Sequence, residues 1–484
     1  MFKIIISNNV RSKIEGELPT GIQNKLDKEL SYFVEGYKFS PRFKMHRWDG
    51  KVHLFSKVSQ SFQTGCFSLI AKLLKDYSIP FEVEDKRPII KPNKEIPLIG
   101  KKEIRDYQQI AVDMLLERTR GVLIAATGAG KTFIIGCVVA KLNLPTIIYV
   151  HTCDLLHQMK DEIEGLLGIK CGQMGDGVID IRQINVATIQ TASRALLGKY
   201  EKEDTDDFAD DEYTNVASCK EQIVDVIKNC NVIIIDETHH ASANSIQAVM
   251  KASEQAFYRY GVTATLREKG DDLLINAVLG RVIYRITASE LIAKGWLIAP
   301  TIYFYEVENT LIDQQGTYQQ VYKKCVLENT YRNKLIVDSA VKFKQSGKKI
   351  LILVRQISHG NILLNYLLPE MSARFLQSKV SSDIRKEILE EFRAGELDCI
   401  IATSLADEGL DLPILDAVIL AGSGMSKVKA MQRIGRAIRK FPGKTKAYIV
   451  DFVDKAHYLH KHSKERFDIY SEEKEFNIKI QKKV

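Results

Sequence analysis

The chain has 484 residues, of which 45% are hydrophobic and 27% are charged, and its formal net charge is +8. Single hydrophobic cores rarely grow beyond roughly 250 residues, so this length predicts about three domains. A charge of this size is by itself only weak support for an acidic partner. The eight cysteines include no C-x-x-C pair, which argues against a disulfide scaffold or a thiolate zinc site and fits a reducing compartment.

The N-terminal stretch MFKIIISNNVRSK contains an apolar run of only three residues. A secretory signal needs roughly 7 to 15, so we expect no signal peptide. Nowhere does the sequence hold the roughly 18 uninterrupted apolar residues of a membrane span. We therefore expect a cytoplasmic protein without a membrane partner, in the host cell cytoplasm if a phage encodes it.

A proline-rich segment separates the first part of the chain from the rest. Pro88, Pro92 and Pro97 lie within ten residues, in DKRPIIKPNKEIPLIGKK. Proline lacks a backbone donor and fixes φ, which disfavours a helix or a central strand and favours a linker. We expect a linker over 91–103 that follows a small α+β domain over 1–90.

Short apolar runs alternate with amphipathic helical patterns through the remainder. Strands are expected at 121–126, 146–151, 184–190, 231–236 and 257–265, and then at 348–356, 397–404, 416–422 and 446–452. Helices are expected between them, for example over 131–142 and 155–167. This alternation is typical of α/β folds with buried parallel sheets. We expect two tandem α/β domains, over 104–298 and 299–484.

An acidic stretch interrupts the first α/β domain. EKEDTDDFADDE (201–212) carries eight acidic residues and one lysine. Self-repulsion predicts a solvated surface insertion. A regulatory arm that competes with DNA for a basic groove is the alternative.

The segment AATGAGKT (125–132) has the strand–loop–helix context of a phosphate-binding loop. Gly128 and Gly130 let the backbone curl so that N–H groups after Thr127 face a phosphate, with the helix N-terminus behind them. Lys131 is expected to reach the β and γ phosphates of ATP, and Thr132 to ligate Mg²⁺. The first glycine of the usual pattern is an alanine in this sequence.

About a hundred residues downstream, NVIIIDETHH (231–240) ends an apolar run in two carboxylates and two histidines. Zinc is one interpretation, but His239 and His240 are adjacent and cannot share a helix face. A phosphate loop instead needs a second acidic element. Asp236 is expected to hold Mg²⁺ through water, Glu237 to polarise the attacking water, and His239 to relay the state of the γ phosphate.

With both elements in place, the chain resembles the DExH helicases of superfamily two. IRDYQ (104–108) resembles the element that recognises adenine, through Gln108, and GVTATL (261–266) resembles the coupling motif with Thr263 and Thr265. ILILVRQISHG, ATSLADEGLDLP and QRIGRAIR resemble the family's fourth, fifth and sixth motifs. The resemblance covers 104–452 and implies two RecA-like domains with ATP in the cleft between them.

The resemblance also implies roles for residues of the second half. Arg436 and Arg439 are expected to reach the phosphates as permanently charged forks, although a solvated basic helix face is the alternative. Gly409 and Asp411 are expected to sense the nucleotide. Contacts with a DNA strand are implied for Thr188, Arg355 and Thr403. We read His457, His460 and His462 as a solvated helix end.

The first domain carries a basic and aromatic segment, GYKFSPRFKMHRWDGKVHLF (36–55). Lys38, Arg42, Lys44 and Arg47 are expected to contact DNA phosphates, and the aromatics either stack on bases or form a small core. We expect Trp48 and Phe55 in the core. The segment also resembles the leading domain of phage UvsW-type helicases, which implies branched DNA and RNA–DNA hybrids as substrates.

We therefore predict an ATP-dependent and Mg²⁺-dependent DNA helicase or translocase that acts as a monomer on branched, duplex or single-stranded DNA in recombination, repair and replication. The motor subunit of a restriction system, an RNA-directed DExH helicase and a binding module with a vestigial ATP site are the alternatives. The intact lysine, acidic pair and arginines disfavour the last of these.

Overall fold

The computed structural model describes residues 2–34, 36–99, 103–198, 218–238, 243–264, 271–307, 316–377, 380–403, 412–422 and 427–481. The acidic stretch 201–212, the coupling-motif residue Thr265 and the predicted site residues His239, Gly409 and Asp411 lie outside these ranges. The chain divides into two compact units, one of residues 1–125 and 130–285 and one of residues 126–129 and 286–484.

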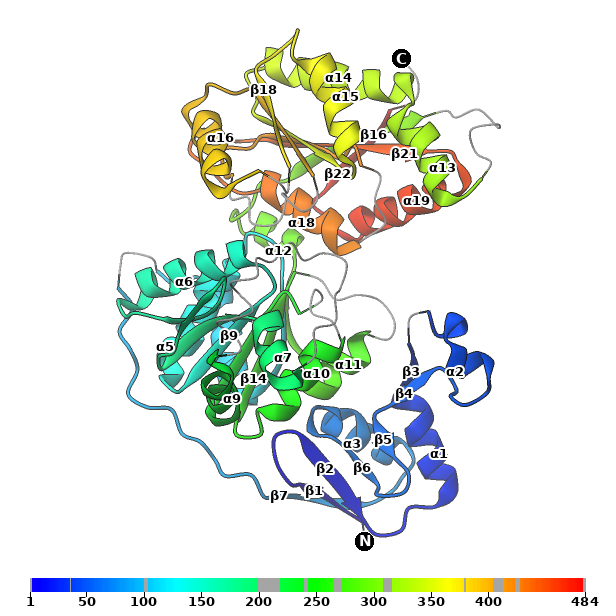
Figure 1. Cartoon of the computed structure of the whole chain (residues 1–484), viewed down its shortest axis with the longest axis vertical. Coiled ribbons are helices and arrows are strands. Elements are labelled where there is room, and N and C mark those ends of the chain that lie inside the picture. Colours follow the sequence, from blue (N-terminus) through cyan, green and yellow to red (C-terminus); the bar gives the residue numbers. More distant parts are fainter. Residues whose placement is uncertain are drawn as a thin grey trace. The chain divides into compact units, whose positions relative to one another are not determined.

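The N-terminal part of the first unit is a small mixed domain with a core of its own. Its elements are β1 (Phe2–Ile6), β2 (Arg11–Glu15), α1 (Thr20–Glu29), β3 (Ser31–Phe33), η1 (Tyr37–Phe39), α2 (Pro41–Lys44), β4 (Lys51–His53), β5 (Phe55–Ser56), β6 (Ser61–Gln63), η2 (Thr64–Cys66), α3 (Phe67–Asp76) and β7 (Phe81–Asp85). Five strands form a sheet in the order β5-β6-β2-β1-β7, and β3 pairs with β4 apart from it (Figure 1). Phe55 is buried in the core of this domain, as expected, whereas Trp48 is half-buried.

The larger part of the first unit is an α/β domain. Its elements are α4 (Asp106–Arg118), β8 (Arg120–Ala125), α5 (Lys131–Leu142), β9 (Thr146–Val150), α6 (Cys153–Leu167), β10 (Gly172–Gly175), β11 (Val178–Asp180), β12 (Ile184–Thr188), α7 (Ile189–Leu197), α9 (Lys220–Asn229), β13 (Val232–Asp236), α10 (Ala243–Ala252), β14 (Tyr258–Thr263), α11 (Asp271–Val278) and β15 (Val282–Ile286).

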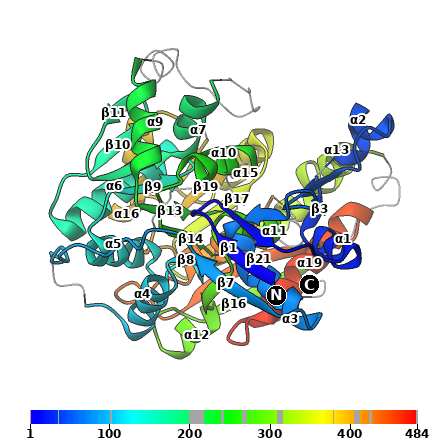
Figure 2. The same ribbon diagram turned by 90° about the horizontal axis from the view of Figure 1, so that it is seen from below.

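The eight strands of this domain form one sheet, in the order β11-β10-β12-β9-β13-β14-β8-β15. From β10 to β8 the neighbouring strands are parallel. Helices α7, α9 and α10 lie on one face of the sheet, and α4, α5 and α6 on the other (Figure 2). Every residue of β9, β12, β13 and β14 is buried, which explains why these strands read as continuous apolar runs in the sequence.

The two parts of the first unit pack directly against each other. A β-carbon at Gly65 of η2 would lie 2.2 Å from the Asn276 carbonyl oxygen of α11, so only glycine allows this approach. The side chain of Asn9 donates to the Glu254 carbonyl over 3.0 Å. The proline-rich segment is also anchored, since Ile99 N–H donates to the Leu166 carbonyl at the end of α6.

The second unit is another α/β domain. Its elements are α12 (Ala288–Ala293), β16 (Pro300–Val307), α13 (Tyr318–Tyr322), the π-helical turn η3 (Lys323–Leu327), α14 (Thr330–Gln345), β17 (Ile350–Val354), α15 (Ile357–Leu367), β18 (Ala373–Leu376), α16 (Ser382–Ala394), β19 (Cys399–Thr403), β20 (Ala417–Ile419), α18 (Lys427–Ala437), β21 (Ala447–Asp454), α19 (His457–Glu472) and β22 (Asn477–Gln481).

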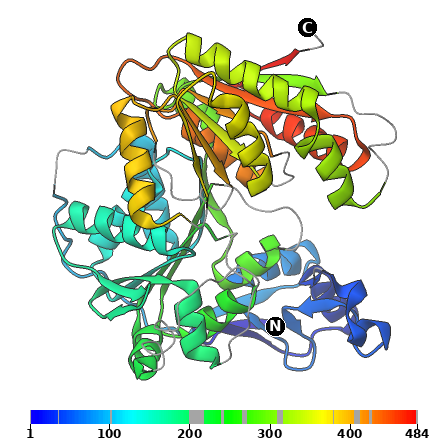
Figure 3. The ribbon, with the colours of Figure 1, turned by 45° about the horizontal axis from the view of Figure 1, so that its top comes forward.

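Its seven strands form a sheet in the order β18-β19-β17-β20-β21-β16-β22, and all of the neighbours are parallel. Helices α14 and α15 pack on one face of it, and α18 and α19 on the other (Figure 3). The buried core on the first of these faces includes Ile336, Leu363, Ile352 and Phe452.

The predicted fold class is confirmed: two parallel α/β sheets follow a small mixed domain. Strands occur at all nine positions where the apolar runs predicted them, with ends that differ by at most three residues. The boundary between the compact units falls after Arg285, earlier in the chain than the predicted start of the last domain at 299. Among the described residues, no helix has the length and hydropathy needed to cross a membrane.

Candidate active site and nucleic-acid interface

The phosphate-binding loop of the sequence lies between β8 and α5. Gly128 and Gly130 have φ values of +89° and +79°, a region that glycine enters without steric cost. Gly130 is the N-cap residue of α5 and provides no side-chain cap. The backbone is therefore arranged as an anion-binding turn requires, with helix N–H groups directed at the loop.

The order of the strands places the other motifs beside this loop. β14 lies between β13 and β8, with Asp236 paired to Val262 and Thr263 paired to Ile124. The strands are parallel, so their carboxyl ends meet at one edge of the sheet, where α/β proteins bind their ligands. Residues about a hundred positions apart in the sequence thus share one site.

Lys131 and Glu237 form an ion pair at this edge. The second carboxylate oxygen of Glu237 accepts hydrogen bonds from Thr263 Oγ1 at 3.2 Å and from the Ala264 N–H at 3.5 Å. Glu237 has a φ of +49°, an uncommon value for a residue with a side chain. The carboxylate is thereby held between the loop lysine and the coupling motif.

Asp236 lies deeper, at the end of β13, and is only 9% exposed. Burial raises the pKa of its carboxyl to about 6, while the ammonium group of Lys131 opposes this shift. Among the described residues, its Oδ1 atom has no hydrogen-bond partner. A buried acceptor of this kind fits a cation or an ordered water that a cation holds, and the half-buried Thr132 at the start of α5 offers a hydroxyl oxygen.

Gln108 lies against the loop but is already engaged. Its Oε1 atom accepts the N–H of Arg105 at 3.1 Å, within a capping box at the start of α4. A β-carbon at Gly130 would lie 2.6 Å from Gln108 Nε2. The side-chain amide therefore touches the phosphate loop, and its contact with adenine stays a prediction.

His151, which directly follows β9, is a site residue that the sequence analysis did not identify. Its electrostatic interaction with Asp236 lowers the pKa of that carboxyl, against the dominant effect of burial. β9 is the neighbour of β13 in the sheet, so His151, directly after β9, and Asp236, the last residue of β13, lie at adjacent strand ends. A histidine after an apolar run was visible in the sequence, but its neighbour was fixed only by the strand order.

The predicted residues of the second unit lie at its own strand and helix ends. Arg436 on α18 and Arg439 just beyond it are half-buried. Arg355 is exposed after β17, and Thr403, at the end of β19, has a buried hydroxyl without a partner among the described residues. Thr188 of the first unit is buried and caps α7 by accepting the Thr191 N–H. The roles predicted for these residues stay predictions.

The basic segment of the N-terminal domain is formed by β3, η1, α2 and β4, and we call it the aromatic knuckle (residues 31–53 without Glu35). Lys38, Arg42, Lys44 and Arg47 are all exposed on it. In the part of the chain that the structure describes, none of the four is within ion-pair distance of a carboxylate. Phe39 is 81% exposed, whereas the Tyr37 ring packs against Phe33 and Phe43.

Comparisons with protein families agree with this arrangement. Residues 101–268 match the family described as the res subunit of type III restriction enzymes, and residues 332–441 match the helicase conserved C-terminal domain. These are the two halves of a helicase motor. The chain belongs to the helicases of superfamily two.

A third match identifies the particular form of this motor. Residues 4–83 match the N-terminal domain of the DNA helicase UvsW. The chain is therefore a superfamily two helicase that carries a UvsW N-terminal domain.

Individual relatives are similar over most of the chain. A DNA 3′-5′ translocase XPB2 of Sulfurisphaera tokodaii is 26% identical over 81% of this chain and 90% of its own length. The ATP-dependent DNA helicase uvsW of Enterobacteria phage T4 is 24% identical over 92% of both chains. A fragment of a putative HsdR subunit of a type I restriction enzyme from Vibrio vulnificus shares the fold, with a TM-score of 0.56, 19% identity and coverage of 97% of this chain and 84% of its own. The protein is an ATP-dependent DNA helicase or translocase.

Proposed function

We propose that the protein uses ATP and Mg²⁺ to move on branched or double-stranded DNA, with junction migration, fork regression and removal of RNA–DNA hybrids as its reactions in recombination, repair and replication. The observation that carries this proposal is the exposed set of cations on the aromatic knuckle, in a domain of the UvsW type. We further propose that the protein acts as a monomer.

The proposed chemistry of ATP hydrolysis follows from the residues at the carboxyl edge of the first sheet. Lys131 binds the β and γ phosphates, which compete with Glu237 for its ammonium group. Once released from Lys131, the Glu237 carboxylate can accept a proton from the attacking water while Thr263 keeps it oriented. Asp236 and Thr132 would hold Mg²⁺, which neutralises phosphate charge when bound. Arg436 and Arg439 are assigned to the same phosphates on the resemblance alone.

The proposed contact with DNA rests on charge and exposure. Cations without nearby carboxylates attract the phosphates of a duplex and release its counterions. An exposed aromatic ring such as Phe39 offers a stacking face to a base that a branch point leaves unpaired. The aromatic knuckle carries both features, so a junction that presents duplex arms and unpaired bases suits it better than a plain duplex.

The test is ATPase activity measured side by side with single-stranded DNA, duplex, a four-way junction, an R-loop and RNA at one ionic strength. We expect the junction and the R-loop to give half-maximal stimulation at the lowest concentrations. Equal stimulation by plain duplex and by the junction would contradict the branched-DNA proposal. Strand-displacement assays with 3′ and 5′ tails would test the 3′-5′ polarity that the name of the archaeal relative suggests.

A restriction motor is the second candidate, because the res-subunit family matches residues 101–268. That match covers the first α/β domain alone, whereas the uvsW relative aligns along 92% of this chain. A restriction motor depends on a methylase or nuclease partner for recognition of its site. Robust DNA-stimulated ATPase activity of the isolated chain on DNA without any recognition sequence would contradict this alternative.

A further inference from the structure

The second unit contains an aromatic pair whose role none of the helicase motifs explains. Tyr318 and Tyr322 lie at the two ends of the short helix α13, with ring centroids 6.0 Å apart. The π-helical turn η3 follows directly, and single π-turns are frequent at functional sites. Tyr322 is buried, whereas Tyr318 is half-buried near the surface.

Both rings face the guanidinium group of Arg355. The Arg355 Cζ atom lies 5.6 Å from the Tyr318 centroid and 5.7 Å from the Tyr322 centroid. Arg355 also donates from Nη1 to the Tyr318 hydroxyl oxygen at 2.9 Å. Two cation–π contacts and a hydrogen bond therefore hold an exposed arginine in one orientation. Arg355 is the residue expected to contact a DNA strand.

The surface around Tyr318 is aromatic and also includes part of α19. The Tyr318 ring lies 6.0 Å from the Tyr458 ring and 5.7 Å from the His462 ring. His462 is half-buried, so the expectation of a solvated helix end is wrong for this histidine. Its burial lowers the pKa of His462 below its usual value, which keeps the imidazole neutral beside Arg355. The contacts with Tyr458 and His462 fix the position of the Tyr318 ring, and the Tyr318 ring in turn orients Arg355.

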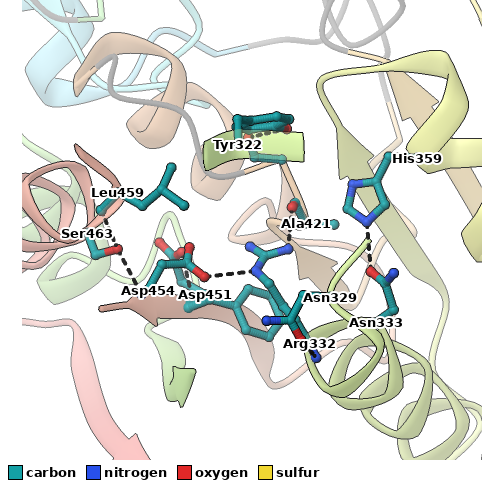
Figure 4. A network of polar contacts seen from close by, with 12 residues as sticks. Tyr322, Asn329, Arg332, Asn333, His359, Ala421, Asp451, Asp454, Leu459 and Ser463 are labelled. Atoms are coloured by element: carbon teal, nitrogen blue, oxygen red, sulfur yellow. Dashed lines mark hydrogen bonds and ion pairs between the residues drawn. The ribbon is translucent and has the colours of Figure 1, made fainter. Parts of the chain in front are cut away.

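Tyr322 makes a second contact, on its inner side. Its hydroxyl donates to the Gly422 carbonyl over 3.1 Å, and burial raises the pKa of Tyr322 to about 12, so the proton stays in place. Arg332 of α14 donates to the neighbouring Ala421 carbonyl at 2.7 Å and pairs with Asp454 (Figure 4). Two side chains therefore hold the backbone that follows β20.

Gly422 connects these two sets of contacts. Its N–H donates to the Leu353 carbonyl, and a β-carbon at this position would lie 2.8 Å from the Arg355 nitrogen. Helix α18, which carries Arg433 and Arg436, packs against β20, the strand that ends just before this glycine. Tyr322 therefore contacts Arg355 through its ring, and through its hydroxyl it contacts the backbone beside the strand on which α18 packs.

We propose that Tyr322 is a positioning residue that couples the binding of a DNA strand at Arg355 to the placement of helix α18. We propose also that Tyr318 orients Arg355 for contact with the DNA strand. A DNA phosphate that binds Arg355 changes the group packed on the Tyr322 ring. The Tyr322 hydroxyl passes this change to the backbone that follows β20, the strand on which α18 packs. The inference rests on the proposed roles of Arg355 and Arg436. It predicts that Tyr322 affects the DNA-stimulated kcat, whereas Tyr318 affects the KM for DNA.

The test compares Tyr322→Phe with Tyr318→Phe, which each remove one hydroxyl and keep the ring. For Y322F we expect the DNA-stimulated kcat to fall by about 3- to 10-fold, as the loss of one hydrogen bond implies, with basal ATPase activity and the KM for DNA within about 2-fold of the parent. For Y318F we expect the KM for DNA to rise by about 3- to 10-fold at an unchanged kcat. Tyr366→Phe, an exposed tyrosine on α15, is the matched control.

Both variants are assayed well below their own unfolding midpoints, so that folded chains are compared. The inference is overturned if Y322F keeps the parent stimulation, or if the two variants change the same parameter, as a merely structural role would predict. If the parent chain is not stimulated by any DNA, the coupling fails together with the proposed function. If the parent is stimulated and Y322F is not impaired, the coupling alone fails.

Discussion

Each of the two α/β units contains an aspartate in a buried strand, but the two carboxylates have opposite environments. Asp236 ends β13 with a carboxylate oxygen that lacks a partner among the described residues. Asp451 in β21 is fully buried, and its oxygens accept from Arg466 Nε at 2.8 Å, from Arg466 Nη2 at 2.9 Å and from the Tyr470 hydroxyl at 3.1 Å. A carboxylate with an unused acceptor can bind a ligand, whereas a saturated one holds its fold together.

The largest effect is expected when the charges of the ATP site in the first unit are removed. Lys131→Ala should abolish ATP hydrolysis, and Glu237→Gln should bind ATP and turn it over roughly 10²- to 10⁴-fold more slowly, because the general base is removed. Steady-state ATPase assays and nucleotide retention on a filter measure both outcomes. Hydrolysis at the parent rate by either variant would show that the site assignment is wrong. Lys141→Ala, at the other end of α5, is the control for the lysine.

The next largest effects are expected from substitutions of the two aspartates, Asp451 and Asp236. Asp451→Ala should lower the free energy of unfolding by about 3–5 kcal/mol, because it leaves Arg466 buried and unpaired. Asp236→Asn should leave stability unchanged or raise it, since burial already penalises the charged carboxylate, while ATPase activity disappears. Urea unfolding and ATPase assays on both variants test this contrast. A large loss of stability in Asp236→Asn would erase the distinction between the two sites.

The aromatic knuckle extends the comparison to charges that are fully exposed. Replacing Lys38, Arg42, Lys44 and Arg47 together with glutamine should weaken junction binding. It should also flatten the salt dependence of binding by roughly 0.9 in log–log slope for every phosphate that the variant no longer neutralises. Basal ATPase activity should change little. The control replaces Lys25, Lys28, Lys72 and Lys75, four exposed lysines of α1 and α3, with the same change in charge. Equal salt slopes for both quadruple variants would contradict the assignment.

The smallest effect is expected at His53, a half-exposed residue of the aromatic knuckle that pairs with two aspartates. Hydrogen bonds to Asp27 and Asp49 raise the pKa of His53, against a smaller opposing effect of burial. A histidine whose pKa is raised on folding stabilises the fold at pH values below about 6.5, and this stabilisation fades as the pH rises through the folded pKa. Solvent screening limits the effect to less than about 1 kcal/mol. NMR titration of the imidazole should show the raised pKa, and His53→Asn should remove this part of the pH dependence of unfolding.

Much of the fold could be predicted because parallel strands buried on both faces appear as apolar runs. The expected strand at 231–236 is Val232–Asp236, and the expected helix at 131–142 is Lys131–Leu142. Strand ends were less certain, as at 348–356, where Lys348 and Lys349 precede the strand that begins at Ile350. Hydrophobicity gives the burial of a segment, but hydrogen bonding to a neighbour determines where the strand stops.

The loop, the lysine and the acidic pair could likewise be predicted, because their chemistry depends on residue types at short spacings. Their mutual contacts could not. Thr263 meets Glu237, and His151 affects Asp236, because β14 and β9 are the two neighbours of β13 in the sheet. Strand order is a property of the folded sheet that local patterns do not contain.

The sequence alone predicted two α/β domains, a phosphate-binding loop and a basic leading domain, since apolar periodicity, glycine spacing and charge are local quantities that residues carry with them. That the two domains form an ATP motor was implied by the resemblance of their motifs to a known family. Only the tertiary structure decided which polar groups are paired. Tyr322 and Gly422 are a hundred positions apart, and only the folding of the second unit brings the Tyr322 hydroxyl to the Gly422 carbonyl. The same physics separates Asp236 from Asp451, because burial and partners, not residue type, determine whether a carboxylate is free to bind.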